Sequence, residues 1–286
     1  RKGAEKILLE SQRQRTLQQA HLLIGKANVP LARDLASTSN PIKQQGFALA
    51  STSSPDPLPR SPKTDSIHVQ TFGRFAVTIN NREITTEAWQ RKKSRDIFKI
   101  LLIHHRNSVT IDELVEYLWA NSVTNNLTST LWNSISYIRK ALEPDIKPHT
   151  PSSYIKIIDK SYILDLGTET TIDFVSFKEL ISASRKEASI DHKITLLEQA
   201  TALYTGDFLK EDLLEDWASY TRETLKDLYI TAVEEMGTLH LGQNNTHQAI
   251  ACARKILGTD MLHENAYCLI FKALIASGNF SELAKS

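Results

Sequence analysis

The 286-residue sequence is poor in glycine, in cysteine and in long apolar runs, and each shortage excludes a class of protein. Its 10 glycines form neither G-x-x-x-x-G-K-[ST] nor G-x-G-x-x-G, so the common phosphate-cradling loops are absent. Two cysteines cannot build a disulfide framework and suit a reducing cytoplasm. No apolar run reaches the about 18 residues of a membrane span, and no secretory signal opens the chain. We therefore expect a cytoplasmic protein that does not act at a membrane.

The sequence also lacks the residue spacings of metal sites and enzymes. H-E-x-x-H is absent, and His247 with Cys252, like His263 with Cys268, stand five residues apart and do not share a helical face. The cysteines are better interpreted as small buried groups on helices. Four acidic residues cluster without a nearby nucleophile, as expected of a loop between helices: Asp207, Asp212, Glu215 and Asp216. We expect no catalytic residue, no metal and no cofactor.

The net charge of +1 conceals an uneven distribution. Residues 1–64 hold 10 Lys and Arg against 4 Asp and Glu, a net of +6. Residues 65–168 hold 13 against 11, a net of +2, and residues 169–286 hold 11 against 18, a net of −7. A basic front and an acidic back indicate different partners for different parts, although an acidic half can also be plain solvated helix surface.

Composition and periodicity divide the chain into four regions. Residues 1–36 contain one helical pattern, over 3–27, and are interpreted as the end of an upstream helical region. Residues 37–64 are a flexible linker, because 14 of these 28 residues are Ser, Thr or Pro and cannot bury a core. Residues 65–168 and 169–286 form the two folded domains. The chain starts at arginine and stops just inside a predicted helix, so we expect a piece of a longer protein.

The region 65–168 has the element order of a winged helix-turn-helix. Alternating residues in IHVQTFGRFAVTINNREI predict two or three short antiparallel strands. Three helices follow, in SRDIFKILLIHH, VTIDELVEYLWA and TLWNSISYIRKAL, and Thr110 with Glu113 forms a capping box at the start of the second. YIKIIDKSYILDL then predicts a hairpin that turns at Asp159 and Lys160.

The region beyond Thr171 reads as helical throughout, over roughly 173–186, 191–204, 213–240, 245–257 and 263–277. GQNNTHQAI and GNFSELA begin 36 residues apart, at Gly242 and Gly278, a period near that of tetratricopeptide-like repeats. One stripe on the longest helix is expected to pack against the helices on either side of it: Trp217, Leu225, Tyr229 and Val233.

The third helix of the winged-helix pattern has two contrasting faces. Its apolar stripe consists of Leu131, Ile135, Ile138 and Leu142. The opposite face carries Ser129, Asn133, Ser136 and Lys140, flanked by Tyr137 and Trp132. A polar face of this kind is either a solvated surface or one that forms hydrogen bonds with a partner. Packing of Trp132 against the preceding loop is the expected role of that side chain.

Three segments in the first domain resemble the OmpR/PhoB-type winged helix, specifically the version in the Streptomyces antibiotic regulatory protein (SARP) family. They are VQTFGRFAVTINNREI, RKKSRDIFKILLIHHRNSVTIDELVEYLW and SISYIRKALEP. IDFVSFKEL and ALYTGDFLKEDLLEDWASYTRETLKDLYITAV resemble the bacterial transcriptional activator domain that follows it. The resemblance covers about residues 66–286 and implies a mainly α protein with a small α+β part, a winged helix before a tetratricopeptide-like domain. It also implies an activator of transcription that binds specific DNA sequences and recruits RNA polymerase.

The resemblance implies that Thr128–Glu143 docks in the major groove of double-stranded DNA. Asn133 would pair with adenine, while Arg139 and Lys140 would neutralise phosphates. Tyr137 stands where many relatives have an arginine that reads the groove, and Ile163 where they have an arginine in the minor groove. The residues expected to contact DNA are Ser129, Thr130, Asn133, Ser136, Tyr137, Arg139, Lys140, Arg91, Lys93 and Lys160.

Several alternatives remain open at this level. The cations of the Arg91–Arg95 cluster either bind phosphate or pair with nearby acids. Because a net of +2 is low for a DNA-binding domain, a degenerate winged helix that binds protein is an alternative reading. A third reading is a sensor whose helical array holds a small effector. The acidic array would contact polymerase, an upstream sensory domain or a second subunit.

Overall fold

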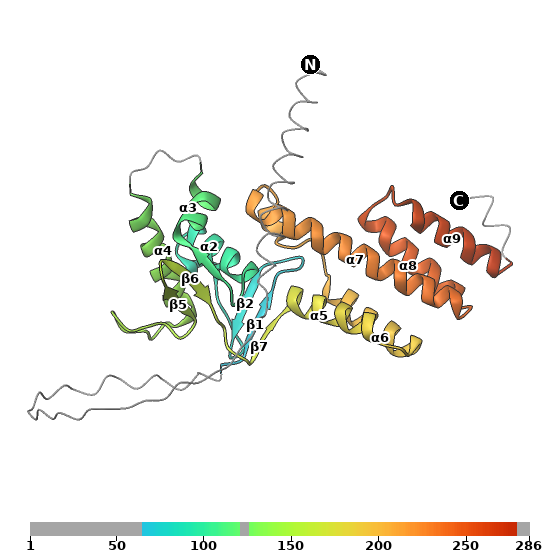
Figure 1. Ribbon diagram of the computed structural model, residues 1–286, viewed down its shortest axis with the longest axis horizontal. Helices are drawn as coiled ribbons and strands as arrows, with labels where there is room; N and C mark the ends of the chain where they lie inside the picture. Colours follow the sequence, from blue (N-terminus) through green and yellow to red (C-terminus); the bar gives the residue numbers. More distant parts are fainter. Residues whose placement is uncertain (1–64, 121–125, 279–286) are drawn as a thin grey trace, which may run out of the picture. The chain divides into compact units, whose positions relative to one another are not determined.

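The computed structural model describes residues 65–120 and 126–278, which all fall in one compact unit that runs from Pro57 to Ser286. A part with strands and three helices comes first, and a helical part follows (Figure 1). We call residues 65–168 the winged-helix part and residues 169–278 the helical part. The helix expected over 3–27 and the linker expected over 37–64 lie outside the described residues.

The winged-helix part has the predicted order of strands, three helices and a hairpin. Its first elements are β1 (Ile67–Gln70), β2 (Ala76–Ile79), β3 (Arg82–Glu83), the 3-10 helix η1 (Thr86–Trp89) and α2 (Lys92–Ile103). The remaining ones are β4 (Ser108–Thr110), α3 (Ile111–Trp119), α4 (Leu127–Leu142), β5 (Ile155–Ile158) and β6 (Ser161–Leu164). β5 and β6 form the predicted antiparallel hairpin, with Ile158 opposite Ser161. Asp159 and Lys160 in its turn both have positive φ, 46° and 61°, as a two-residue hairpin turn requires.

The start of α3 agrees with the predicted capping box and adds a strand that the periodicity did not indicate. The backbone N–H of Glu113 donates to Thr110 Oγ1 at 3.1 Å, and the backbone N–H of Thr110 donates to Glu113 Oε2 at 2.8 Å. The residues up to and including Thr110 form β4, which pairs with β6, with Val109 opposite Tyr162. The sequence VTI was predicted to be helical, but its first two residues complete a three-stranded sheet of order β4-β6-β5.

The helical part contains the five predicted helices. It begins with β7 (Thr170–Ile172), α5 (Asp173–Lys186) and α6 (Ile190–Leu203), and continues through the 3-10 helix η2 (Lys210–Asp212) to α7 (Asp216–Gly242), α8 (Thr246–Thr259) and α9 (Glu264–Ala276). On α7, Leu225, Tyr229 and Val233 are buried as predicted, whereas Trp217 is only half-buried. Gly237 lets the helices approach closely, because an added Cβ would lie 2.5 Å from Leu269 Cδ2.

The two cysteines of the helical part differ in their surroundings. Cys252 on α8 is buried, as expected, and burial raises the pKa of its thiol. Cys268 on α9 is exposed, so the prediction of a buried group was wrong there. The error arises because α9 exposes the face on which residue 268 lies, together with its neighbour Tyr267, which is 42% exposed.

A shared sheet joins the two parts. β7, just past the predicted domain boundary at residue 168, pairs in parallel with β1, so the sheet order is β3-β2-β1-β7. Asp173 then begins α5, and its carboxylate accepts hydrogen bonds from the backbone N–H groups of Thr71 at 2.6 Å, Phe72 at 2.8 Å and Phe174 at 2.7 Å. One carboxylate thus satisfies backbone groups at the end of β1 and at the start of a helix.

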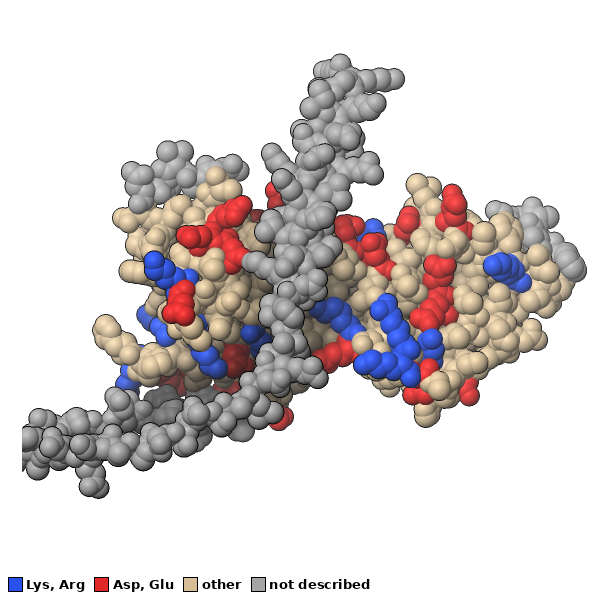
Figure 2. All heavy atoms as spheres, in the orientation of Figure 1, with Lys and Arg blue, Asp and Glu red and all other residues tan. Residues whose placement is uncertain are grey.

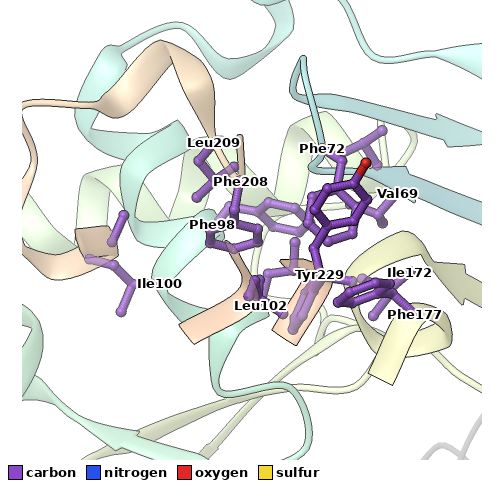
Figure 3. Packing of buried hydrophobic residues seen from close by; sticks show 14 of the residues in the cluster. Val69, Phe72, Phe98, Ile100, Leu102, Ile172, Phe177, Phe208, Leu209 and Tyr229 are labelled. Carbon is purple, nitrogen blue, oxygen red and sulfur yellow. The ribbon is translucent and has the colours of Figure 1, made fainter. Parts of the chain in front are cut away.

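The loop between α6 and α7 closes over the turn that follows β1. The backbone N–H of Gly73 donates to the Asp207 carbonyl at 3.2 Å. Gly73 has φ +75°, and a Cβ on Gly206 would lie 3.1 Å from its Cα, so neither position has room for a larger residue. Phe72 lies at the centre of the contact (Figure 3), with ring centroids 5.4 Å from Phe177 and 6.4 Å from Phe208. The two parts therefore share one hydrophobic core.

Candidate nucleic-acid interface

Helix α4 divides into a buried and an exposed face along the predicted line. The four residues of its apolar stripe are all 3% exposed or less, and the helix packs against α2, α3 and η1. Its N-terminus has no side-chain cap, and Arg139 and Lys140 lie in its last turn, where positive charge suits the helix dipole. The exposed side chains on the opposite face are Ser129, Asn133, Ser136 and Lys140. The fold thus presents a polar helical face to its surroundings.

The other residues of α4 that were predicted to contact DNA are less accessible to a partner. Ser129 and Thr130 both donate their hydroxyl groups to the Asn126 carbonyl, at 3.0 and 3.2 Å, so their oxygens retain only acceptor capacity. Arg139 is half-buried. Tyr137 is also half-buried, and the Arg91 guanidinium lies over its ring, 5.5 Å from the centroid. Arg91 of the α2 N-terminus is therefore brought beside the exposed face of α4.

Trp132 is one of the exposed large side chains of α4. Its side chain is 60% exposed, and the preceding loop against which it was predicted to pack, residues 121–125, lies outside the described residues. Leu131 and Ile135 occupy the contact with the core, and Trp132 points away from it. The exposed face of α4 consequently includes a large aromatic side chain.

The wing formed by β5 and β6 is apolar rather than basic. Ile157 is 56% exposed and Ile158 is 52% exposed, and Ile163 is half-buried. Lys156 is engaged with Asp165 at 2.8 Å. Lys160, the predicted contact in the turn, is exposed, and its carbonyl accepts a hydrogen bond from the Ile111 N–H at 3.1 Å. The turn is thereby tied to the start of α3, and one cation is presented at its tip.

The basic cluster at the start of α2 is partly used inside the molecule. Lys92 forms a short ion pair with Glu215 of the helical part, and Arg95 Nη1 lies 3.6 Å from Glu211 Oε2. Lys93 donates to the Leu118 carbonyl at 3.1 Å, at the end of α3. The pairing with acids that the sequence left open for Arg91 and Arg95 is thus present at Arg95 and at Lys92, while Arg91 faces Tyr137.

A buried ion pair lies behind this cluster, and the sequence-based interpretation did not include it. Lys99 Nζ is 2.5 Å from Asp212 Oδ2, and the two side chains are 0% and 1% exposed. Burial lowers the pKa of Lys99, against the opposite effect of its hydrogen bond to Asp212. Arg222, also buried, donates to the carbonyls of Phe208 at 2.9 Å and Asp212 at 2.8 Å. A lysine inside the otherwise apolar run of α2 was the available signal.

The surface charges are mixed. On the face drawn in Figure 2, Lys and Arg stand among Asp and Glu over both parts of the described chain, and no large single-sign area stands out. Nowhere in residues 65–120 and 126–278 do three or more His, Cys, Asp or Glu side chains gather as a metal ion would require. Among the described helices, none combines the length and apolar character needed to cross a bilayer.

Two family models match the chain, one on each part. Residues 85–161 match the model described as "Transcriptional regulatory protein, C terminal", and residues 172–283 match "Bacterial transcriptional activator domain". No curated protein matches the sequence. Among solved structures, Mycobacterium tuberculosis EmbR, determined in complex with a low affinity phosphopeptide, superposes with a TM-score of 0.67 at 17% identity. The match covers 76% of this chain and 57% of the EmbR chain, and at that identity it establishes the shared fold.

Proposed function

We propose that this chain, which carries the winged helix and activator domain of the SARP-like transcriptional regulators, binds double-stranded DNA through α4. The observation that carries the proposal is the exposed polar face of α4 on a helix whose other face fills the winged-helix core. The B-DNA major groove is wide enough to admit a helix, and its base edges offer donors and acceptors to such a face. Selection of binding duplexes from a random pool, followed by fluorescence anisotropy with the whole chain, tests the proposal directly.

Different side chains of α4 are suited to bases and to phosphates. Asn133 is exposed near the middle of the helix, and its amide can donate to and accept from one adenine edge. Lys140 is exposed two turns later on the same side, where a point charge suits a phosphate. Arg91, Arg139 and Lys160 supply the remaining phosphate contacts. Lys93 is left out of the proposed contacts, because its ammonium already binds the end of α3.

The salt dependence of DNA binding should be shallow. If Arg91, Arg139, Lys140 and Lys160 each contact one phosphate, the logarithm of the binding constant should fall with the logarithm of salt concentration at a slope of about −3 to −4. Anisotropy titrations between about 50 and 200 mM salt measure the slope. Lys140→Ala should make it shallower by about one, whereas Lys92→Ala should leave it unchanged. A wild-type slope of about −8 would contradict the internal pairing of the α2 cations.

Substitution of Asn133 should relax sequence preference. Asn133→Ala is expected to cost roughly 1–3 kcal/mol of binding free energy on the best duplex and almost nothing on random duplexes. Lys140→Ala, its matched control on the same helical face, should weaken binding to both kinds of duplex alike. Competition titrations with selected and random duplexes measure both losses. Equal losses for Asn133→Ala on the two duplexes would rule out a reading role for this residue.

We further propose that the helical part contacts RNA polymerase. The match of residues 172–283 to an activator domain supports this assignment, and the net charge of −7 in residues 169–286 suits a basic partner surface. Run-off transcription from a promoter that carries the selected duplex, with purified polymerase, tests the contact. More transcript with the chain than without it supports activation, and less transcript identifies a repressor.

A further inference from the structure

Trp132 stands out among the side chains of α4. It is 60% exposed, although it has the largest apolar side chain on this helix. Ser129, three residues before it, and Ser136, four residues after it, are exposed as well. Residues at these spacings are neighbours on a helix surface, so the exposed indole borders the polar face of α4.

Among residues 65–120 and 126–278, no contact gives Trp132 a structural role. Leu131, Ile135 and Ile138, at 0%, 3% and 0% exposure, fill the contact between α4 and the core. No hydrogen bond joins the indole N–H to another of the described residues, and its ring makes no aromatic pair within them. Leaving an indole in water forgoes a large hydrophobic gain. A side chain that is exposed at this cost, on a face that is otherwise polar, points to a partner surface with an apolar element.

The major groove contains one apolar group on its base edges, the C5 methyl of thymine. A phosphate can accept a hydrogen bond from the indole N–H but offers no apolar surface to the ring, and base stacking requires an unstacked base, which an intact duplex does not offer. The neighbouring Asn133 supplies the amide that suits adenine, so α4 carries adjacent groups for both bases of an A·T-rich step. We propose that Trp132 reads a thymine by packing its ring against the C5 methyl group. The inference rests on the proposed function, since it takes α4 to lie in the major groove.

Deoxyuridine scanning of the selected duplex isolates this contact. Replacement of one thymine by deoxyuridine removes only the methyl group and keeps the base pair. For the wild-type chain, one or two positions should show about fourfold weaker binding, the value of one buried methyl group. For Trp132→Ala, binding to the thymine duplex should already be weaker, and deoxyuridine at those positions should change it less than about twofold. Tyr267→Ala, which removes an exposed aromatic ring from α9, is the matched control and should behave as wild type.

The outcomes separate this inference from the proposal beneath it. Binding of selected duplexes with no effect of deoxyuridine at any position overturns the role of Trp132 and leaves DNA binding standing. Equal deoxyuridine effects in wild type and Trp132→Ala assign the methyl contact to another residue, and also overturn it. Failure to bind any duplex overturns the proposed function together with the inference. Circular dichroism of both variants verifies that the fold is unchanged.

Discussion

Lys99→Met should lower the free energy of unfolding by about 3–5 kcal/mol. The substitution leaves Asp212 as a buried charge without its partner, since the two side chains are 0% and 1% exposed and 2.5 Å apart. Removal of one charge of a buried ion pair lowers the free energy of unfolding by more than the intact pair contributes to it. The remaining charge is then buried with neither water nor an opposite charge to stabilise it. Because Lys99 belongs to the winged-helix part and Asp212 to the helical part, the variant should also loosen the contact between the parts. Urea unfolding followed by circular dichroism measures the change.

The double variant Lys99→Met with Asp212→Leu tests the cause. It removes both charges, so most of the stability lost in Lys99→Met should return. Lys92→Met is the control at the same interface, since its pair with Glu215 is partly exposed, with side chains 59% and 24% exposed, and should contribute about 1 kcal/mol or less. If the double variant is no more stable than Lys99→Met, the loss comes from packing of the lysine stem rather than from the unpaired charge.

Asp96→Asn should raise the free energy of unfolding at pH 8 by about 2–3 kcal/mol. Asp96 is fully buried on α2, and neither carboxylate oxygen accepts a hydrogen bond from the described residues. Burial raises the pKa of its carboxyl group from 3.8 to about 6. Lys92 and Lys93 favour the charged form and lower this pKa, whereas Asp212 and Glu215 oppose it. An amide imitates the neutral acid and avoids the cost of a buried charge at high pH.

The same residue should give stability a specific pH dependence. An unfolded Asp96 ionises near 3.8, so between this pH and about 6 the folded state binds more protons than the unfolded state. The contribution of Asp96 to stability therefore falls as the pH rises through this window, and Asp96→Asn should remove that fall. Asp112→Asn, an exposed acid on α3, is the matched control. If the free energy of unfolding changes with pH in the same way for the wild type and for Asp96→Asn between pH 4 and 8, Asp96 is not the source of the pH dependence.

Elements with local signals could be predicted from the sequence. The capping box of Thr110 and Glu113 and the turn at Asp159 and Lys160 depend on neighbouring residues, and both are present in the structure. The prediction of the apolar stripe of α4 was correct, because the 3.6-residue period of a helix indicates which face is buried. The order of these elements then led to the winged helix and the helical domain, which the family models and the EmbR fold confirm.

Features that depend on distant partners could not be predicted. β4 and β7 have three residues each, too few for a periodic signal, and they exist because β6 and β1 lie beside them. From the sequence, the cations of α2 were interpreted as an outward-facing basic cluster, because the acids that pair with them lie more than a hundred positions later in the chain. Asp212 was interpreted as a loop acid for the same reason. Which residues of α4 contact DNA stays a prediction, because contact requires the partner.

The strand β7 also determines when the chain can fold as it is made. Thr71 meets Asp173, which is 102 residues later, and Phe72 meets Thr205, which is 133 residues later. A ribosome that adds about 5–20 residues per second leaves the first sheet without its fourth strand for on the order of 5–20 s. During that time one edge of β1 is open to other strands. The proposed DNA-binding part is therefore completed only after synthesis of the helical part has begun, so nascent chains that stop before β7 should not acquire a finished winged helix.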